Sequence, residues 1–262
     1  MIRYIHNFFQ NLGINLHRLG VSIISFPKFI LDFISFRTEA KKLGLNINFT
    51  LKPCLYERFQ NAGIMKGHYF HQDLHIASRI FKRNPSRHVD IGSRIDGFVA
   101  HVASFREIEV FDIRPIYEKM HTIHFSQLDF MKPLHEKYYG YCESLSCLHA
   151  LEHFGLGRYG DPVDAIGYKK GLKNLCLMLS TGGILYLSVP VGREQVCFNA
   201  HRIFNPFSLL NELDENMELQ RFSYVGDSGD FFEDVNLSNF KKEILPKLEY
   251  GCGIFEILKG KD

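Results

Sequence analysis

The sequence predicts an α/β domain, from about residue 85 to the C-terminus, built on a mostly parallel sheet that helices cover on both faces. From Arg87 onward, short apolar runs of strand length alternate with amphipathic helical segments. Parallel strands need crossover connections, which are usually helices, so this alternation is typical of α/β folds. The 262 residues are 45% hydrophobic and 23% charged, the composition of a folded chain with one large core. We therefore expect one domain over residues 85–262, preceded by a helical extension over residues 1–84.

Seven strands and three helices make up the expected fold. The strands are expected at His88–Ile91, Glu109–Asp112, Thr122–Gln127, Cys142–Leu148, Ile184–Val189, Leu219–Val225 and Gly253–Leu258. The helices are expected at Gln72–Lys82, Phe98–Phe105 and Tyr168–Leu179, the last of which ends at Thr181–Gly183. The last two strands are expected to form a closing antiparallel pair, and the acidic run Asp227–Asp234 a solvated hairpin.

The leading segment, residues 1–40, has a helical and amphipathic pattern rich in Phe and Ile. Residues 1–53 carry seven Lys and Arg against two acidic residues, so the basic excess of the chain lies here. One interpretation is a helical pair that packs on the main domain or on a second subunit. The other is a basic, aromatic-rich helix on an anionic membrane surface. A spanning helix is disfavoured because Pro27, Lys28 and Asp32 interrupt the apolar stretch Leu19–Phe36.

Charge and cysteine usage exclude several classes of protein. The net charge of +2 lacks the basic excess of a nucleic-acid-binding protein. Six cysteines are scattered without a CxxC pair, as in proteins of a reducing compartment. No compact apolar run with a small-residue cleavage site marks a secretory signal. We expect a cytoplasmic protein that is either free or peripheral at the inner face of the membrane.

Potential metal ligands gather ahead of the first predicted helix, at His68, His71, Asp73 and His75. Their spacing matches no standard zinc signature. A capped helix start at Gln72–Asp73 explains the polar residues more simply. We therefore expect no metal site.

Residues suited to binding a nucleotide-like cofactor follow the first three predicted strands. The first strand runs into the turn Gly92–Gly97 and then a helix, which presents backbone N–H groups and a positive helix end. Asp112 ends the second strand, 20 residues beyond Gly92, where an acidic group can bond both ribose hydroxyls. Asp129 follows the third strand, placed to meet an adenine amino group.

This order of motifs resembles the class I S-adenosylmethionine-dependent methyltransferases over about residues 85–260. Their cofactor turn, ribose-binding acid, adenine-binding acid, LEH segment and GG-strand segment match Asp90–Gly97, Asp112, Asp129, Leu151–His153 and Gly182–Val189. The resemblance implies a Rossmann-like fold and S-adenosylmethionine as cofactor. The cofactor-binding residues that it implies are Asp90, Gly92, Arg94, Gly97, Asp112, Asp129 and Leu148.

Three longer stretches resemble an uncharacterised methyltransferase-like family, first catalogued as a domain of unknown function from nematodes. They are Asp90–Gly97, Leu148–Pro162 and Ser188–Phe204. Bacterial members resemble it too and tend to accompany surface-polysaccharide genes, so this resemblance implies polysaccharide biosynthesis and a sugar-like methyl acceptor.

The turn departs from the family pattern in one respect. Arg94 and Asp96 replace the second and third glycines, and Gly97 comes one position late. Arg94 cannot give the close backbone approach of a glycine. Its guanidinium either pairs with the carboxylate of the cofactor or pairs with Asp96 and blocks the pocket.

Methyl transfer to a hydroxyl requires a base, and three histidines are candidates: His149, His153 and His201. Alternatively, His149 caps or packs beneath its loop, and His201 bonds backbone carbonyls. Glu152 either orients His153, binds the ammonium group of the cofactor, or is an exposed loop charge.

Four further residues are candidates for substrate binding: Arg158, Tyr159, Arg193 and Asn199. The first two lie in a glycine-rich loop, and the last two follow the fifth strand. They either contact a hydroxylated substrate or form internal turns.

We therefore predict an S-adenosylmethionine-dependent methyltransferase for a small polar acceptor, such as a cell-surface sugar. One alternative is a degenerate fold that has lost the cofactor and serves as an interaction partner in a glycan pathway. The other is an enzyme that binds a nucleotide-sugar in the same crevice. A dinucleotide enzyme is disfavoured because the glycine triplet is missing.

Overall fold

The structure is a computed structural model that describes residues 13 and 15–261. The chain divides into two compact units, Met1–Ile64 and Met65–Asp262. Each unit is described by itself.

The first unit contains one long helix, α2 (Leu16–Lys42), and a short turn of 3-10 helix, η1 (Glu57–Phe59). The side chain of Asn15 caps α2 by accepting a hydrogen bond from the backbone of Arg18, at 2.9 Å. The helix continues through Pro27, and Asp32 forms ion pairs with Lys28 and Arg58. The expected helical pair is thus one continuous helix where it is described; the rest of that prediction falls on residues outside the described part.

Most of α2 is exposed, including large apolar side chains such as Ile23, Ile24 and Leu31. By length and composition alone, the helix is long and apolar enough to cross a membrane. The three residues expected to interrupt a span therefore do not break the helix.

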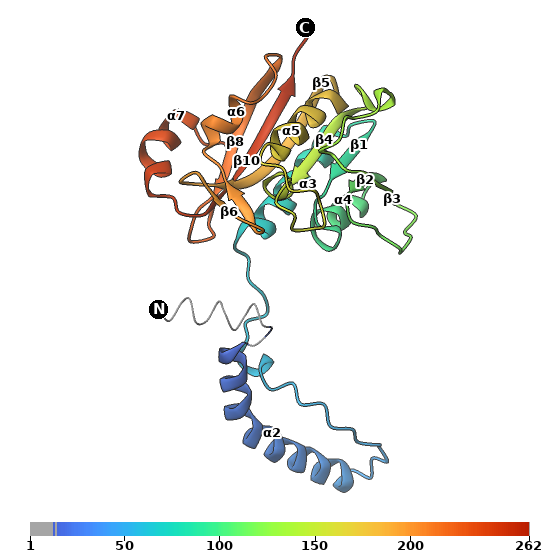
Figure 1. Ribbon diagram of the computed structural model, residues 1–262. Helices are drawn as coiled ribbons and strands as arrows, with labels where there is room; N and C mark the ends of the chain where they lie inside the picture. The colour runs from blue at the N-terminus through green and yellow to red at the C-terminus, as the bar shows by residue number, and fades with distance from the viewer. Residues whose placement is uncertain (1–12, 14, 262) are drawn as a thin grey trace. The chain divides into compact units, whose positions relative to one another are not determined.

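The second unit is built on an eight-stranded sheet in the order β3-β2-β1-β4-β5-β10-β8-β9 (Figure 1). The strands are β1 (His88–Ile91), β2 (Ile108–Asp112), β3 (Ile123–Gln127), β4 (Cys142–Leu148), β5 (Leu179–Val191), β8 (Met217–Val225), β9 (Phe231–Phe232) and β10 (Gly251–Lys259). The first five are parallel to one another, and β10 runs antiparallel between β5 and β8. All seven predicted strands are present. The run Asp227–Asp234 forms the predicted hairpin, which adds β9.

The helices and short helical turns connect these strands. They are α3 (His68–Arg83), η2 (Ile95–Val99), α4 (Ala100–Ala103), η3 (Glu136–Tyr138), η4 (Leu151–His153), α5 (Gly167–Met178), α6 (Pro206–Leu210), α7 (Leu237–Asn239), η5 (Phe240–Ile244) and η6 (Leu245–Lys247). A separate two-stranded sheet, β6 (Gln195–Cys197) and β7 (His201–Ile203), was not predicted. The helix α5 ends earlier than predicted because Leu179 already pairs with Cys142 of β4.

The core forms one apolar layer on each face of the sheet. Leu172 and Leu175 of α5 pack on the face that carries Leu185. Ile76 of α3 packs on the opposite face, together with η2 and α4. Neighbouring residues of β5 alternate between the two layers, as side chains of a strand buried on both faces must. Helices on both faces thus bury the sheet and leave the carboxyl ends of its parallel strands for a site.

Candidate active site

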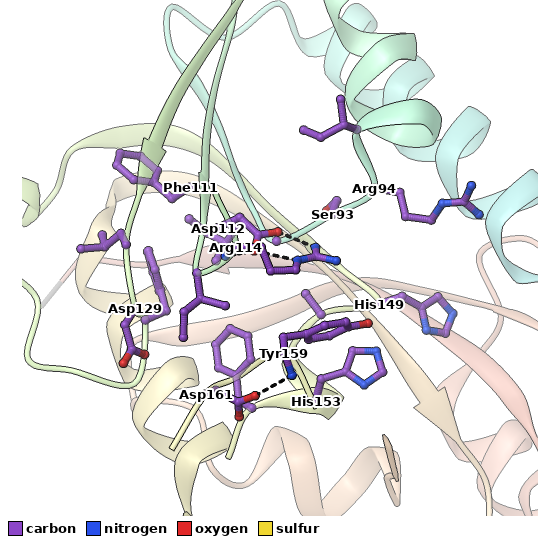
Figure 2. A pocket seen from close by; sticks show the side chains of 18 of the residues that line it. Ser93, Arg94, Phe111, Asp112, Arg114, Asp129, His149, His153, Tyr159 and Asp161 are labelled. Atoms are coloured by element: carbon purple, nitrogen blue, oxygen red, sulfur yellow. Dashed lines mark hydrogen bonds and ion pairs between the residues drawn. The ribbon is translucent and has the colours of Figure 1, made fainter. Parts of the chain in front are cut away.

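A cavity of about 540 Å³ lies where the parallel strands end (Figure 2). Its walls come from the segments that follow β1, β2, β3 and β4, from the loop 154–161, and from Tyr69 of α3. This is the edge where ligands bind in open α/β sheets, and the volume is in the range of small-molecule and cofactor sites.

The turn after β1 lies on the cavity wall. Gly92 has a φ of 72°, and a Cβ there would lie 3.0 Å from the Cβ of Ala150. Glycine is the residue that adopts this backbone conformation without strain. Its backbone N–H donates to the carbonyl of Phe111, at 2.9 Å, which ties the turn to β2.

Asp90 holds the turn from beneath. Its fully buried carboxyl accepts hydrogen bonds from the backbone and the hydroxyl of Ser93, at 3.0 and 2.6 Å, and from the hydroxyl of Ser146, at 2.5 Å. Burial outweighs these bonds and raises the pKa of Asp90 to about 7. The structure thus gives Asp90 a supporting contact with the turn.

Arg94 pairs with Asp96 through two hydrogen bonds of 3.2 and 3.0 Å. Both side chains are exposed, and the guanidinium lies 5.0 Å from the ring centre of Tyr69. The pair lies along the wall of the cavity and leaves its volume open. Gly97 is needed at its position because a Cβ there would lie 2.7 Å from the carboxylate of Asp73 in α3.

Asp112 ends β2 with its carboxylate held by Arg114. The backbone and the Nε of Arg114 donate to one carboxylate oxygen, at 2.8 and 3.0 Å, and Nη2 donates to the other, at 2.5 Å. Arg114 also lies 4.5 Å from the ring centre of Tyr159 across the cavity (Figure 2). Since each carboxylate oxygen has two lone pairs, Asp112 keeps one free acceptor position. Binding two ribose hydroxyls therefore requires the Arg114 side chain to move.

Asp129 follows β3 on the same wall. One of its carboxylate oxygens accepts a hydrogen bond from the backbone of Met131, at 2.9 Å. Its side chain is only 13% exposed, and the nearest cation, on Lys132, lies 3.9 Å from its other carboxylate oxygen. Asp129 therefore retains acceptor capacity toward the cavity.

His153 is oriented by a hydrogen bond of 2.6 Å from its Nδ1 to the backbone carbonyl of Ala200. Because a carbonyl only accepts, Nδ1 carries the proton, and Nε2, which lies 3.7 Å from a carboxylate oxygen of Glu152, carries the lone pair. Burial lowers the pKa of His153 and is only partly offset by the charge of Glu152. The neutral form, which can accept a proton, is therefore favoured near neutral pH.

His149 and Glu152 form a buried pair. The Nδ1 of His149 lies 2.7 Å from a carboxylate oxygen of Glu152, whose side chain is 1% exposed. Burial alone would raise the pKa of Glu152, but the charge of His149 and their hydrogen bond outweigh burial and lower it. Glu152 is thus an internal partner of the histidines and not an exposed loop charge.

The loop 154–161 is shaped around Asp161. The side chain of Asp161 accepts backbone hydrogen bonds from Gly155, Gly157 and Tyr159, at 2.9, 3.2 and 3.1 Å. These bonds fix the position from which Tyr159 faces the cavity.

The predicted site residues fall into three groups. Those that line the cavity are Gly92, Arg94, Asp112, Asp129, His149, His153 and Tyr159. Asp90, Leu148 and Glu152 are buried and do not line it, and Gly97 lies in η2 against Asp73. Those outside the cavity wall are Arg158, Arg193, Asn199 and His201.

The sequence did not single out two polar residues of the cavity wall, Tyr69 and Arg114. Tyr69 belongs to α3, whose predicted start at Gln72 excluded it. Arg114 lies two residues beyond Asp112, and this spacing alone does not distinguish a partner of the carboxylate from a surface cation.

The fold is that of the Rossmann-like class I methyltransferases. The structure is similar to the [4+2]-cyclase SpnF (TM-score 0.52, 14% identity, 76% of this chain and 89% of that chain). It is also similar to the N-methyltransferase NodS from Bradyrhizobium japonicum WM9 in complex with S-adenosyl-L-homocysteine (TM-score 0.50, 12% identity, 74% of this chain and 89% of that chain). Residues 100–236 match DUF268, described as a Caenorhabditis protein of unknown function, and the chain belongs to this family. No curated protein matches the sequence.

Proposed function

We propose that the protein is an S-adenosylmethionine-dependent methyltransferase for a small polar acceptor. The observation that carries this proposal is the pair of acids at successive strand ends, Asp112 and Asp129, on one cavity that also contains the Gly92 turn. Fold similarity alone does not define the reaction, since one similar structure is a cyclase and another a methyltransferase.

The residues present fit this cofactor. The Gly92 turn lines the part of the cavity where the amino-acid end would lie, and Asp129 offers a carboxylate to the adenine amino group. Asp112 offers a carboxylate to the ribose once the Arg114 side chain moves. Arg94 lies at the rim, where its guanidinium suits the cofactor carboxylate. When bound, the cofactor supplies an electrophilic methyl group on a sulfonium.

His153 is the base that the geometry favours. It lines the cavity, its Nε2 carries the lone pair, and its lowered pKa keeps it neutral. His201 lies outside the wall, with its ring 5.1 Å from that of Tyr250. A base accepts the proton of an acceptor hydroxyl as the new bond forms, which supports a hydroxylated acceptor such as a sugar.

Calorimetric titration with S-adenosylmethionine and S-adenosylhomocysteine tests the proposal. We expect micromolar binding to the wild type and a loss of at least about tenfold in Asp112→Asn, because a charged acceptor contributes about 1.5–3 kcal/mol to a hydrogen bond. Arg114→Gln frees Asp112 and is expected to bind as tightly as the wild type or more tightly.

The exposed variant Glu215→Gln makes the same change of charge away from the cavity and serves as control. Absence of binding by the wild type would contradict the proposal. It would favour the alternative in which the protein has lost the cofactor and serves as an interaction partner. The observation that supports this alternative is the pairing of the Asp112 carboxylate with Arg114. Binding of a nucleotide-sugar, without binding of S-adenosylmethionine, would favour the alternative of an enzyme that acts on nucleotide-sugars.

We also propose that α2 associates with the inner face of an anionic membrane. Its exposed apolar side chains and its basic residues, including Lys41 and Lys42 in the last turn, support this.

Flotation with anionic vesicles tests this proposal, and we expect the wild-type protein to rise with the vesicles. Ile24→Glu should weaken vesicle binding at least about tenfold, since it removes an apolar side chain that the membrane would bury. Ile64→Glu, equally 75% exposed but outside the helix, is the control. Equal binding by Ile24→Glu would exclude α2 as the contact.

A further inference from the structure

A second group of polar side chains meets at His149, on the wall of the cavity. His68 begins α3, His149 follows β4, and Cys252 lies near the start of β10. One ring nitrogen from each histidine and the sulfur of Cys252 all lie within 4.8 Å of one another. His149 and Cys252 are buried and His68 is partly buried, while His149 also lines the cavity. Three ligand-type atoms thus converge from segments far apart in the sequence.

His149 carries a nitrogen that its surroundings leave unused. Its Nδ1 hydrogen-bonds to Glu152, whereas its Nε2 has no hydrogen-bond partner among the described residues. The side chain is only 4% exposed, so water does not replace that partner readily. Metal-binding histidines almost always donate their other ring N–H to a carboxylate or carbonyl, which is the arrangement of His149 and Glu152.

His68 contacts two aromatic side chains at the start of α3. Its ring stacks on that of Tyr250, at 5.2 Å between centres. Its ring is nearly parallel to that of His149, at 5.2 Å between centres.

We propose that His68, His149 and Cys252 bind one divalent transition-metal ion of the zinc type. One thiolate and two imidazoles form a ligand set suited to zinc, and three protein ligands with an open fourth position are typical of catalytic zinc sites. Zinc bonds of about 2.0–2.1 Å to nitrogen and 2.3 Å to sulfur place tetrahedral ligand atoms about 3.5 Å apart. The ligand atoms, now within 4.8 Å of one another, would therefore approach by up to about 1.3 Å when the ion binds.

The ion would lie beside the cavity in which we place methyl transfer. Resting on that proposed function, the open fourth position would bind a hydroxyl or thiol of the acceptor and lower its pKa. His149 would then serve as a ligand, which leaves His153 as the base.

Titration of the chelator-treated full chain with Co²⁺ or Zn²⁺, without S-adenosylmethionine, tests the site. We expect one equivalent to bind, with a thiolate-to-cobalt charge-transfer band in the near ultraviolet. Cys252→Ser should abolish the band, while Cys176→Ser, a buried thiol in α5, should leave it unchanged. Glu152→Gln should weaken binding by about 10–100-fold, as loss of a carboxylate partner of a ligand does.

Binding below a tenth of an equivalent, or an unchanged band in Cys252→Ser, would overturn the assignment. If Cys252→Ser does not fold, the same titration is made with His68→Gln, at the more exposed start of α3. We expect His68→Gln to weaken metal binding at least about tenfold. Metal binding that persists when S-adenosylmethionine fails to bind would contradict the proposed function and leave the metal site standing.

Discussion

Replacing His153 with Gln is expected to lower the turnover number by about 10²–10⁴-fold, because a positioned general base contributes a factor of this size. Glutamine preserves much of the shape and the hydrogen bond to the carbonyl of Ala200, but it cannot accept a proton. The measurement is release of S-adenosylhomocysteine with the best acceptor from a panel of sugars. Cofactor affinity, measured by calorimetry, should remain within about threefold of the wild type.

The pH profile distinguishes a base from a structural role. A base acts when unprotonated, and burial lowers the pKa of His153 below its ordinary value of 6.5. The wild-type kcat/KM should therefore rise with pH and reach its plateau near or below pH 6.5, and His153→Gln should lose this rise. His201→Gln, outside the cavity wall, is the control and should keep both rate and profile. A His153→Gln enzyme with full activity would exclude His153 as the base.

The sheet and the cofactor end of the cavity could be predicted because both follow from local pattern. Short apolar runs define parallel strands, and the ends of such strands meet at one edge. This rule predicts that Asp112, Asp129 and the Gly92 turn lie together, and all three line the same cavity. The rule does not predict which side chains from other helices and strands reach that edge.

The side chains that the sequence analysis missed come from elements whose position depends on tertiary packing. The helix α3 was assigned to the extension, so Tyr69 had no predicted neighbour in the cavity. His68 was considered as a metal ligand only with residues close to it in the sequence, whereas the structure places it beside His149 and Cys252. Cys252 stands in an apolar run, where a thiol is typical of a small core residue. Only the antiparallel insertion of β10 beside β5 brings it to the same edge as His149.

The pairing of Arg94 with Asp96 shows why an atypical motif needs a structure. The sequence left two outcomes for Arg94, contact with the cofactor or a blocked pocket. The pair forms, yet both side chains remain exposed and the cavity stays open. The missing glycines are thus tolerated because the substituted side chains point toward solvent along the wall, while Gly92 keeps the close contact with Ala150.

Gly155→Ala is expected to destabilise the fold by about 3 kcal/mol or more, which lowers the midpoint of thermal unfolding by roughly 6–12 °C. Gly155 has a φ of 76°, and a Cβ there would lie 2.0 Å from the backbone carbonyl oxygen of Asp164. The left-handed conformation costs about 1 kcal/mol for alanine, and relief of the contact requires the backbone to move. Differential scanning calorimetry measures the loss.

Gly160→Ala separates these two effects, because Gly160 has a φ of 79° but would meet nothing within 4 Å among the described residues. It should cost only the conformational penalty of about 1 kcal/mol. The loop between the two glycines presents Tyr159 to the cavity through the bonds of Asp161. Movement at Gly155 should therefore also weaken ligand binding, whereas Gly160→Ala should preserve it. Equal stability of the two variants would show that the backbone at Asp164 moves at little cost in free energy. The contact between Gly155 and Asp164 would then not position Tyr159.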